Sequence, residues 1–122
     1  MTDKPDLVGE KCVACRRDAP KVTPEEISEL KPLVPDWEIV DVAGVPRLSR
    51  TVKFPDFARA LAFTNKVGAL AEAADHHPEI RTAWGEVTVS WWTHKIRGLH
   101  RNDFIMAAKT DRLILDSPGT AI

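Results

Sequence analysis

The chain has 122 residues, of which 43% are hydrophobic and 29% are charged, and its formal net charge at pH 7 is -1. This length suits one hydrophobic core, so we expect a single globular domain. The balanced charge gives no reason to expect nucleic-acid binding, and no apolar run reaches the roughly 18–20 residues that cross a bilayer. Residues 1–11 carry charges without an apolar stretch, so we expect no signal peptide and a cytoplasmic protein.

Residues 1–22 are polar and lack apolar periodicity, so they are predicted to form an extended arm. This arm carries the only two cysteines, Cys12 and Cys15, in a C-x-x-C spacing. Such a pair could be half of a zinc site or a redox pair. A structural zinc needs four ligands, however, and no second pair completes the set. We therefore interpret the pair as reduced thiols on a tail.

An ordered domain is predicted over residues 23–116, followed by a tail at residues 117–122. The domain begins with a short helix, because Thr23, Pro24 and Glu26 have the spacing of a capping box with proline in the first turn. Pro32 is expected to stop this helix.

Two strands and a long helix follow. Residues 37–42 and 45–54 are rich in β-branched side chains on either side of the turn Ala43-Gly44, which predicts a hairpin. A helix is predicted to begin near Asp56 and to end at Asp75. Its apolar residues recur at steps of three and four, which indicates one buried face: Ala60, Phe63, Val67, Leu70 and Ala74.

A second hairpin is predicted from residues 79–84 and 87–93 around Gly85-Glu86, because a two-residue loop that begins with glycine suits a type II′ turn. Paired residues would then have numbers that sum to 171, and His77 would lie directly opposite His94. Strand alternation predicts one mostly apolar set that faces the helices: Ile80, Thr82, Trp84, Val87, Val89 and Trp91. The other set is predicted to face outward: Glu79, Arg81, Thr88, Ser90, Trp92 and His94.

A last helix is predicted after Gly98-Leu99, ending between Asp116 and Gly119. Four strands and three helices that do not alternate as βαβ units indicate an α+β fold. We expect a four-stranded antiparallel sheet with the three helices packed on one face.

Three of the four histidines, His76, His77 and His94, belong to this hairpin and its flanks. Imidazole exchanges protons near neutral pH, so a cluster of these rings suits general acid–base catalysis. Metal binding is an alternative, although adjacent strand residues point to opposite faces, and His76 and His77 could not both bind one ion from a regular strand. Each ring could also serve only as a hydrogen-bonding group at a strand end.

The neighbouring polar and aromatic residues also have two readings. If His100 caps the last helix, Asp103 lies in its first turn and complements the helix dipole, or else it orients a histidine. Glu72 could support the site or simply lie on the solvated side of its helix. Trp84 and Trp92 are candidates for stacking on a planar substrate, but aromatic residues in hairpins also pack on each other.

The chain thus carries Glu72, His76-His77-Pro78, Trp84, His94 and Asp103 at defined spacings. This arrangement resembles the signature of the pterin-4a-carbinolamine dehydratases, and the resemblance extends over about residues 23–113. The C-x-x-C arm and the run from Trp91 to Asp103 resemble the bacterial members.

The resemblance implies an enzyme that removes water from 4a-hydroxytetrahydrobiopterin to give quinonoid dihydropterin, which recycles the pterin cofactor of phenylalanine hydroxylase. His76 and His94 would be the acid–base pair, His77 would chiefly bind substrate, and Glu72 and Asp103 would support the site. The resemblance also implies no metal or organic cofactor, and a homodimer or homotetramer.

Two further expectations follow. Relatives on the same fold act as transcriptional coactivators or assembly factors, so an interaction protein is the alternative function; the histidine signature favours the enzyme. Since the resemblance uses both His76 and His77, we predict that their backbone is a helix-to-strand junction rather than regular strand.

Overall fold

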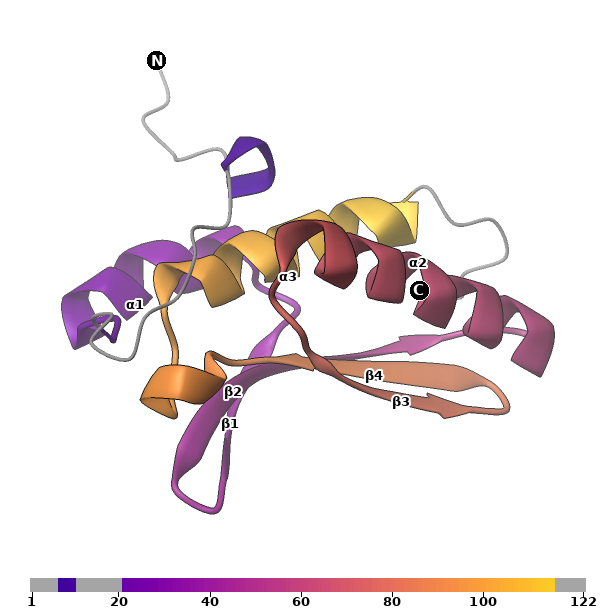
Figure 1. Ribbon diagram of the computed structural model, residues 1–122, viewed down its shortest axis with the longest axis horizontal. Helices are drawn as coiled ribbons and strands as arrows, with labels where there is room; N and C mark the ends of the chain where they lie inside the picture. Colours follow the sequence, from indigo (N-terminus) through magenta and orange to yellow (C-terminus); the bar gives the residue numbers. More distant parts are fainter. Residues whose placement is uncertain (1–6, 11–20, 116–122) are drawn as a thin grey trace.

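The computed structural model describes residues 7–10 and 21–115, which form a helical layer on a twisted sheet (Figure 1). The sheet has the strand order β1-β2-β4-β3, and every neighbouring pair is antiparallel. The strands are β1 (Glu38–Val42), β2 (Val45–Lys53), β3 (Glu79–Ala83) and β4 (Glu86–Trp91). The helices are α1 (Pro24–Leu30), α2 (Phe57–Ala74) and α3 (Arg101–Leu115). All three lie on one side of the sheet, which confirms the expected α+β architecture (Figure 1).

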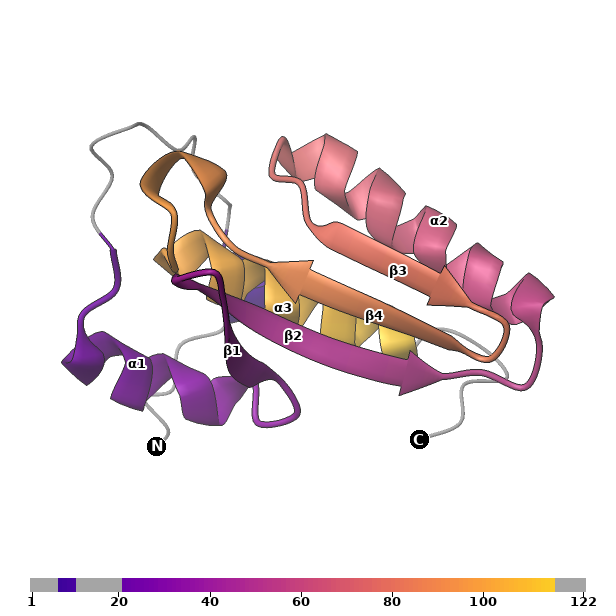
Figure 2. The same cartoon turned by 90° about the horizontal axis from the view of Figure 1, so that it is seen from below.

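The core lies between α2, α3 and the inner face of the sheet. As predicted, α2 turns one apolar face inward, and Ala60, Phe63 and Val67 on it are at most 1% exposed. Of the alternating residues that were expected to face the helices, Val87, Val89 and Trp91 are completely buried, whereas Trp84 is 70% exposed and does not face them. The opposite face of the sheet carries the polar set, and Figure 2 views the sheet from that side.

The two ends of α2 are well defined, and its C-terminal end determines where the chain leaves the helix to reach His76 and His77. Asp56 caps the start of α2 by accepting a hydrogen bond from the backbone N–H of Arg59 at 2.8 Å. Asp75 ends the helix in the left-handed conformation, at φ 52°. The next three residues, 76–78, belong to neither helix nor strand before β3 begins at Glu79. The predicted helix-to-strand junction is therefore confirmed.

The predicted register of the second hairpin is wrong by two residues. Ala83 pairs with Glu86, so Trp84-Gly85 forms the turn and paired numbers sum to 169. The reason is a contact outside the hairpin: the backbone N–H of Phe54 donates to the carbonyl of Gly85 at 2.8 Å. A Cβ atom at position 85 would come within 3.3 Å of the Phe54 carbonyl oxygen, so glycine allows the two backbones to approach closely here. A two-residue shift keeps the side chains of the paired residues on their predicted faces, while Trp84 moves from the predicted strand into the turn.

The predicted extended arm folds back in part. Residues 7–9 form a short 3-10 helix, η1 (Leu7–Gly9), in which Leu7 is only 3% exposed and belongs to the core. Glu10 then forms two hydrogen bonds with Arg101, at 2.7 and 2.9 Å, at the start of α3. Cys12, Cys15 and the predicted tail at residues 117–122 lie outside the described residues.

Candidate active site at the junction between α2 and β3

His76 is buried where the chain leaves α2. Its backbone N–H donates to the carbonyl of Ala71, and its ring stacks on Trp91 with centroids 5.8 Å apart and planes 4° apart. Nε2 lies 2.7 Å from Oδ1 of Asp103, and the side chains of this pair are 7% and 0% exposed. A carboxylate only accepts hydrogen bonds, so Nε2 of His76 carries the proton.

Asp103 joins three parts of the chain. Besides His76, its carboxylate accepts hydrogen bonds from Thr93 Oγ1 and from the backbone N–H of His100, both at 2.8 Å and both to Oδ2. His100 in turn accepts from the backbone N–H of Asn102 through Nδ1, at 3.0 Å. His100 is thus the helix cap, and Asp103 both closes the cap and orients a histidine. The sequence suggested that Asp103 either supports the start of a helix or orients a histidine, and the same carboxylate does both.

His94 begins a tight loop after β4. Thr93 and Gly98 pair through their backbones, which closes the short 3-10 helix η3 (His94–Ile96), and Arg97 adopts φ 51° to complete the turn. His94 is exposed, and its Nε2 lies 3.3 Å from the backbone carbonyl of His77. The two residues are neighbours, although not as the directly opposed strand pair that the sequence predicted.

His77 and Glu72 form the outer part of the cluster. Nε2 of His77 donates to Oε2 of Glu72 at 3.1 Å. Their side chains are 55% and 77% exposed. This pair therefore lies in solvent beside the buried pair of His76 and Asp103.

The three rings share one hydrogen-bonding feature that bears on their chemistry. In each ring Nε2 faces an oxygen that accepts: a carboxylate for His76 and His77, and a peptide carbonyl for His94. The proton therefore sits on Nε2, and Nδ1 is the nitrogen with the lone pair. A ring with this arrangement can accept a further proton at Nδ1. Among residues 7–10 and 21–115, no three His, Cys, Asp or Glu side chains are arranged to hold a metal ion.

The two candidate tryptophans lie in different places. Trp92 stacks on His94, with ring centroids 4.4 Å apart, and so belongs to the site. Trp84 lies in the turn between β3 and β4 and is 70% exposed. The six residues of β4, about 20 Å in length, separate this turn from the histidines. The structure does not bring Trp84 to the site or turn it into the core.

Comparison with known proteins agrees with this arrangement. The family model described as pterin 4 alpha carbinolamine dehydratase matches residues 20–113. The chain belongs to this family. A protein of Nitrosococcus oceani, provisionally named pterin-4-alpha-carbinolamine dehydratase, is 62% identical over 109 residues, which cover 89% of this chain and 96% of the relative. One of Syntrophotalea carbinolica with the same provisional name is 64% identical over 103 residues, which cover 84% and 92%.

A solved structure is also similar. The crystal structure of a transcriptional coactivator/pterin dehydratase from Brucella melitensis superimposes with a TM-score of 0.70 at 33% identity, and the match covers 77% of this chain and 98% of that one. The dehydratase family is therefore supported by both sequence and fold. In the described part of this dehydratase-family chain, no helix is long and apolar enough to cross a membrane.

Sequence reasoning missed two residues of the site. Thr93 fixes the second carboxylate oxygen of Asp103, and its position directly before His94 was a signal that could have been used. Arg47 lies over the indole of Trp92, with Cζ 3.8 Å from the ring centroid. Finding Arg47 requires knowing that β2 pairs with β4, which no local pattern reveals.

Proposed function

We propose that this protein dehydrates a pterin 4a-carbinolamine by histidine acid–base catalysis, with His76 and His94 as the proton-transferring pair. The observation that carries the proposal is the buried pair of His76 and Asp103, linked through Thr93 to the residue next along the chain, His94. A histidine fixed by a buried carboxylate, close to a second, exposed histidine, is the arrangement that two coupled proton transfers need.

The reaction has two proton steps. Hydroxide leaves poorly, so a protonated imidazole gives its proton to the 4a oxygen as the C4a–O bond breaks and water departs. The electron pair for this expulsion comes from the neighbouring ring nitrogen, and a neutral imidazole takes the proton from that nitrogen. Both rings then return to their starting states by exchange with solvent. Positioned transfers of this kind typically contribute 10²–10⁴-fold to the rate.

The two histidines differ in the role that suits each. Asp103 can balance the positive charge on His76, so His76 suits the acid. His94 carries a lone pair on Nδ1 and faces solvent, so it suits the base. His77 and Glu72 lie at the exposed side of the cluster, where they would hold the polar edge of the pterin.

We also propose that the reaction recycles the pterin cofactor of phenylalanine hydroxylase in the cytoplasm, and that the protein works as a homodimer or homotetramer. The edge strand β1 supports an oligomer, because all five of its residues are exposed. Three of them are large and apolar, and an apolar edge strand with free backbone groups is a ready surface for a second chain: Ile39, Val40 and Val42.

A stopped-flow assay of carbinolamine breakdown tests the catalytic proposal. We expect His76→Gln and His94→Gln each to lower kcat by about 10²-fold or more. His100→Asn is the matched control, because the ring of His100 caps α3 through the backbone N–H of Asn102, and asparagine also caps helices. An unchanged rate in folded His76→Gln and His94→Gln would exclude the proposed catalysis.

An interaction role is the second candidate, because the Brucella melitensis relative is described as a transcriptional coactivator as well as a dehydratase. A host whose growth on phenylalanine depends on pterin recycling separates the two. If the folded double variant H76Q/H94Q fails to support growth, the enzyme reaction is what the cell requires. If it supports growth as well as the natural chain, the interaction role is favoured.

A further inference from the structure

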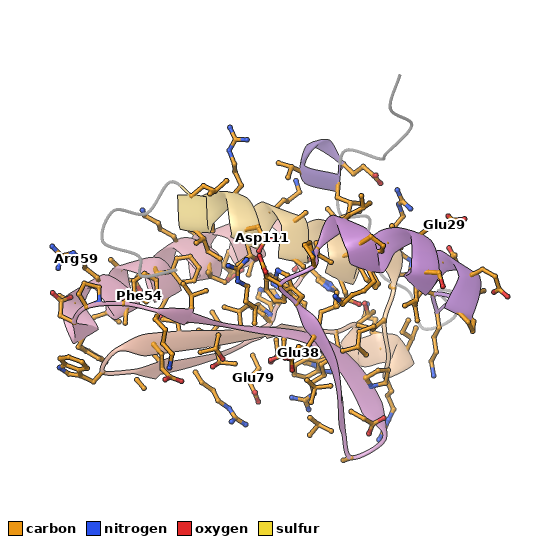
Figure 3. The ribbon with its side chains drawn as sticks, turned by 180° about the vertical axis from the view of Figure 1, so that it is seen from behind. Glu29, Glu38, Phe54, Arg59, Glu79 and Asp111 are labelled. Atoms are coloured by element: carbon orange, nitrogen blue, oxygen red, sulfur yellow. The ribbon has the colours of Figure 1, made fainter. Side chains whose placement is uncertain are left out.

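We propose that Arg47 is a positioning residue for His94 and acts through Trp92. The inference rests on the proposed acid–base role of His94. It concerns a contact on the open face of the sheet, the face away from the helices, where Glu79 also points (Figure 3).

The strand pairing brings Arg47 to Trp92. Leu48 pairs with Trp91 in the ladder between β2 and β4, so Arg47 and Trp92 are the next two positions along the same ladder. Both side chains then lie on the same face of the sheet. The guanidinium sits over the indole, with Cζ 3.8 Å from the ring centroid, which is a cation–π distance.

The indole contacts both Arg47 and His94. Arg47 reaches across the sheet to Glu79, 3.7 Å from Nη1 to Oε2, and Glu79 pairs with Ser90, two residues before Trp92. His94 lies two residues after Trp92, stacks on the indole with centroids 4.4 Å apart, and contacts the carbonyl of His77. The guanidinium and the imidazole therefore both lie within contact distance of the same indole.

This arrangement assigns Trp92 a different task from the one that the sequence predicted. Its ring already contacts a cation and the ring of His94, which leaves less of the indole open to a pterin. It acts instead as a packing surface that holds the ring of His94 in position. The predicted stacking role of Trp92 on substrate is replaced, in this proposal, by a structural one.

Arg47 is suited to hold the indole of Trp92 in place. Its side chain is only 17% exposed, and Nε is the one buried side-chain nitrogen or oxygen in the described part of the chain without a hydrogen-bond partner. Burying an unpaired N–H is costly, so the stack on Trp92 and the ion pair with Glu79 must retain the guanidinium there. Without the cation the indole can turn, and the ring of His94 loses its support on that side. A displacement of about 1 Å at a reacting group can cost roughly 10²-fold in rate.

The test uses Arg47→Met, which keeps an unbranched side chain, although a shorter one, and removes the cation. We expect kcat for carbinolamine dehydration to fall by about tenfold with little change in KM. Arg81→Met is the matched control: Arg81 lies on the same face and also approaches Glu79, at 3.4 Å, but is 77% exposed and does not contact the indole. It should leave kcat unchanged. Arg47→Lys should recover part of the loss, because lysine restores the charge but not the planar stack.

A double-mutant cycle tests whether Arg47 acts through Trp92. With Trp92→Leu as the second change, the double variant should lose no more activity than Trp92→Leu alone, because the same support is already gone. If the two losses multiply instead, Arg47 acts independently of Trp92 and the proposal is overturned. Should Arg47→Met fail to fold, the same cycle with Arg47→Lys decides the question.

A readout without turnover separates this inference from the proposed function. In NMR spectra, nuclear Overhauser contacts between the indole of Trp92 and the ring of His94 should weaken in Arg47→Met and persist in Arg81→Met. Contacts that persist in Arg47→Met overturn the inference even if the enzyme proposal holds. Contacts that weaken, in a protein whose His94→Gln variant is fully active, support the inference and reject the catalytic role of His94.

Discussion

His76 and Asp103 are 27 residues apart in the chain, yet Nε2 of the one lies 2.7 Å from Oδ1 of the other with both side chains buried. The pair connects the end of α2 with the start of α3. Because Asp103 also binds Thr93 and the backbone of His100, one carboxylate sets the positions of three segments. The stability of the fold and the proposed acid–base chemistry therefore both depend on this residue.

Asp103→Asn should impair both properties. An amide keeps the size but presents N–H groups in place of one accepting oxygen, so it cannot accept from His76, Thr93 and His100 as the carboxylate does. We expect the free energy of unfolding to fall by about 2 kcal/mol, the scale of a hydrogen bond to a charged group. We expect kcat to fall by about 10²-fold, since His76 loses its orientation.

Urea denaturation and the stopped-flow assay measure the two effects. Asp56→Asn is the control, because Asp56 also caps the start of a helix, its carboxylate otherwise pairs with the exposed guanidinium of Arg59, and asparagine caps equally well. Normal stability and rate in Asp103→Asn would show that the carboxylate is not the organising group.

Glu72→Gln should have a small effect that is confined to substrate binding. The pair of Glu72 and His77 is more than half exposed on both sides, and exposed ion pairs contribute at most about 1 kcal/mol. We expect unchanged stability and a rise in KM of at most about fivefold, with kcat retained. A large fall in kcat at constant KM would instead assign Glu72 to the proton transfers.

Leu7→Ala tests whether the N-terminal segment belongs to the domain. Leu7 is 3% exposed against the core, and replacing a buried leucine with alanine removes apolar contacts and leaves a cavity. We expect a loss of about 2 kcal/mol of unfolding free energy by urea denaturation. Val8→Ala, in the next residue and 38% exposed, should cost less than about 0.5 kcal/mol. If both substitutions lower the free energy of unfolding by the same small amount, residues 7–10 do not contribute to the core.

Local patterns were sufficient for much of this fold. The stripe of α2, the capping box at Thr23 and the turn at Ala43-Gly44 depend on residues close together in sequence, and all three occur as expected. The junction at residues 76–78 was also predictable, because Pro78 disfavours helix before it, and because a regular strand would have turned the adjacent His76 and His77 to opposite faces although both were expected at one site.

Contacts between distant segments were not predictable in the same way. The turn at Gly85 is set by the backbone of Phe54, which no hairpin rule includes. The task of Asp103 depends on Thr93 arriving from another strand, and that of Arg47 on the pairing of β2 with β4. Sequence reasoning thus named the histidines with Glu72 and Asp103, but not Thr93 or Arg47.

Glu10→Gln should lower stability only above the titration range of Glu10. The hydrogen bonds from Arg101 hold the pKa of this carboxyl below its usual value of 4.5. A lowered pKa in the folded state means stability that is present above pH 4.5 and is lost as pH falls through the folded-state pKa. The pair is partly exposed, so we expect a difference below about 1 kcal/mol at pH 7. Urea denaturation at pH 7 and pH 3 measures it, with exposed Glu38→Gln as the control; a difference that persists unchanged at pH 3 would contradict the charge argument.

Asp111 should produce the opposite pH dependence. It lies between α3 and the sheet (Figure 3), where it accepts hydrogen bonds from Trp37 Nε1 at 2.7 Å and Arg50 Nη1 at 2.8 Å. Burial nevertheless raises its pKa above the usual 3.8, because desolvation outweighs these favourable contacts. Between pH 3.8 and the higher folded-state value, the folded protein binds more protons than the unfolded chain, so this residue lowers stability as pH rises through that window.

Asp111→Asn removes the titration and keeps an oxygen that can accept from Trp37. We therefore expect the stability of the natural protein, relative to the variant, to be highest below pH 3.8 and to decline as pH rises to neutrality. Urea denaturation of both proteins at pH 3, 5 and 7 gives this difference, and the other titrating groups cancel because the two chains share them. If the stability of the natural protein relative to the variant instead increases as pH rises, then the attraction of Arg50 outweighs desolvation, and Asp111 is a stabilising anion at neutral pH.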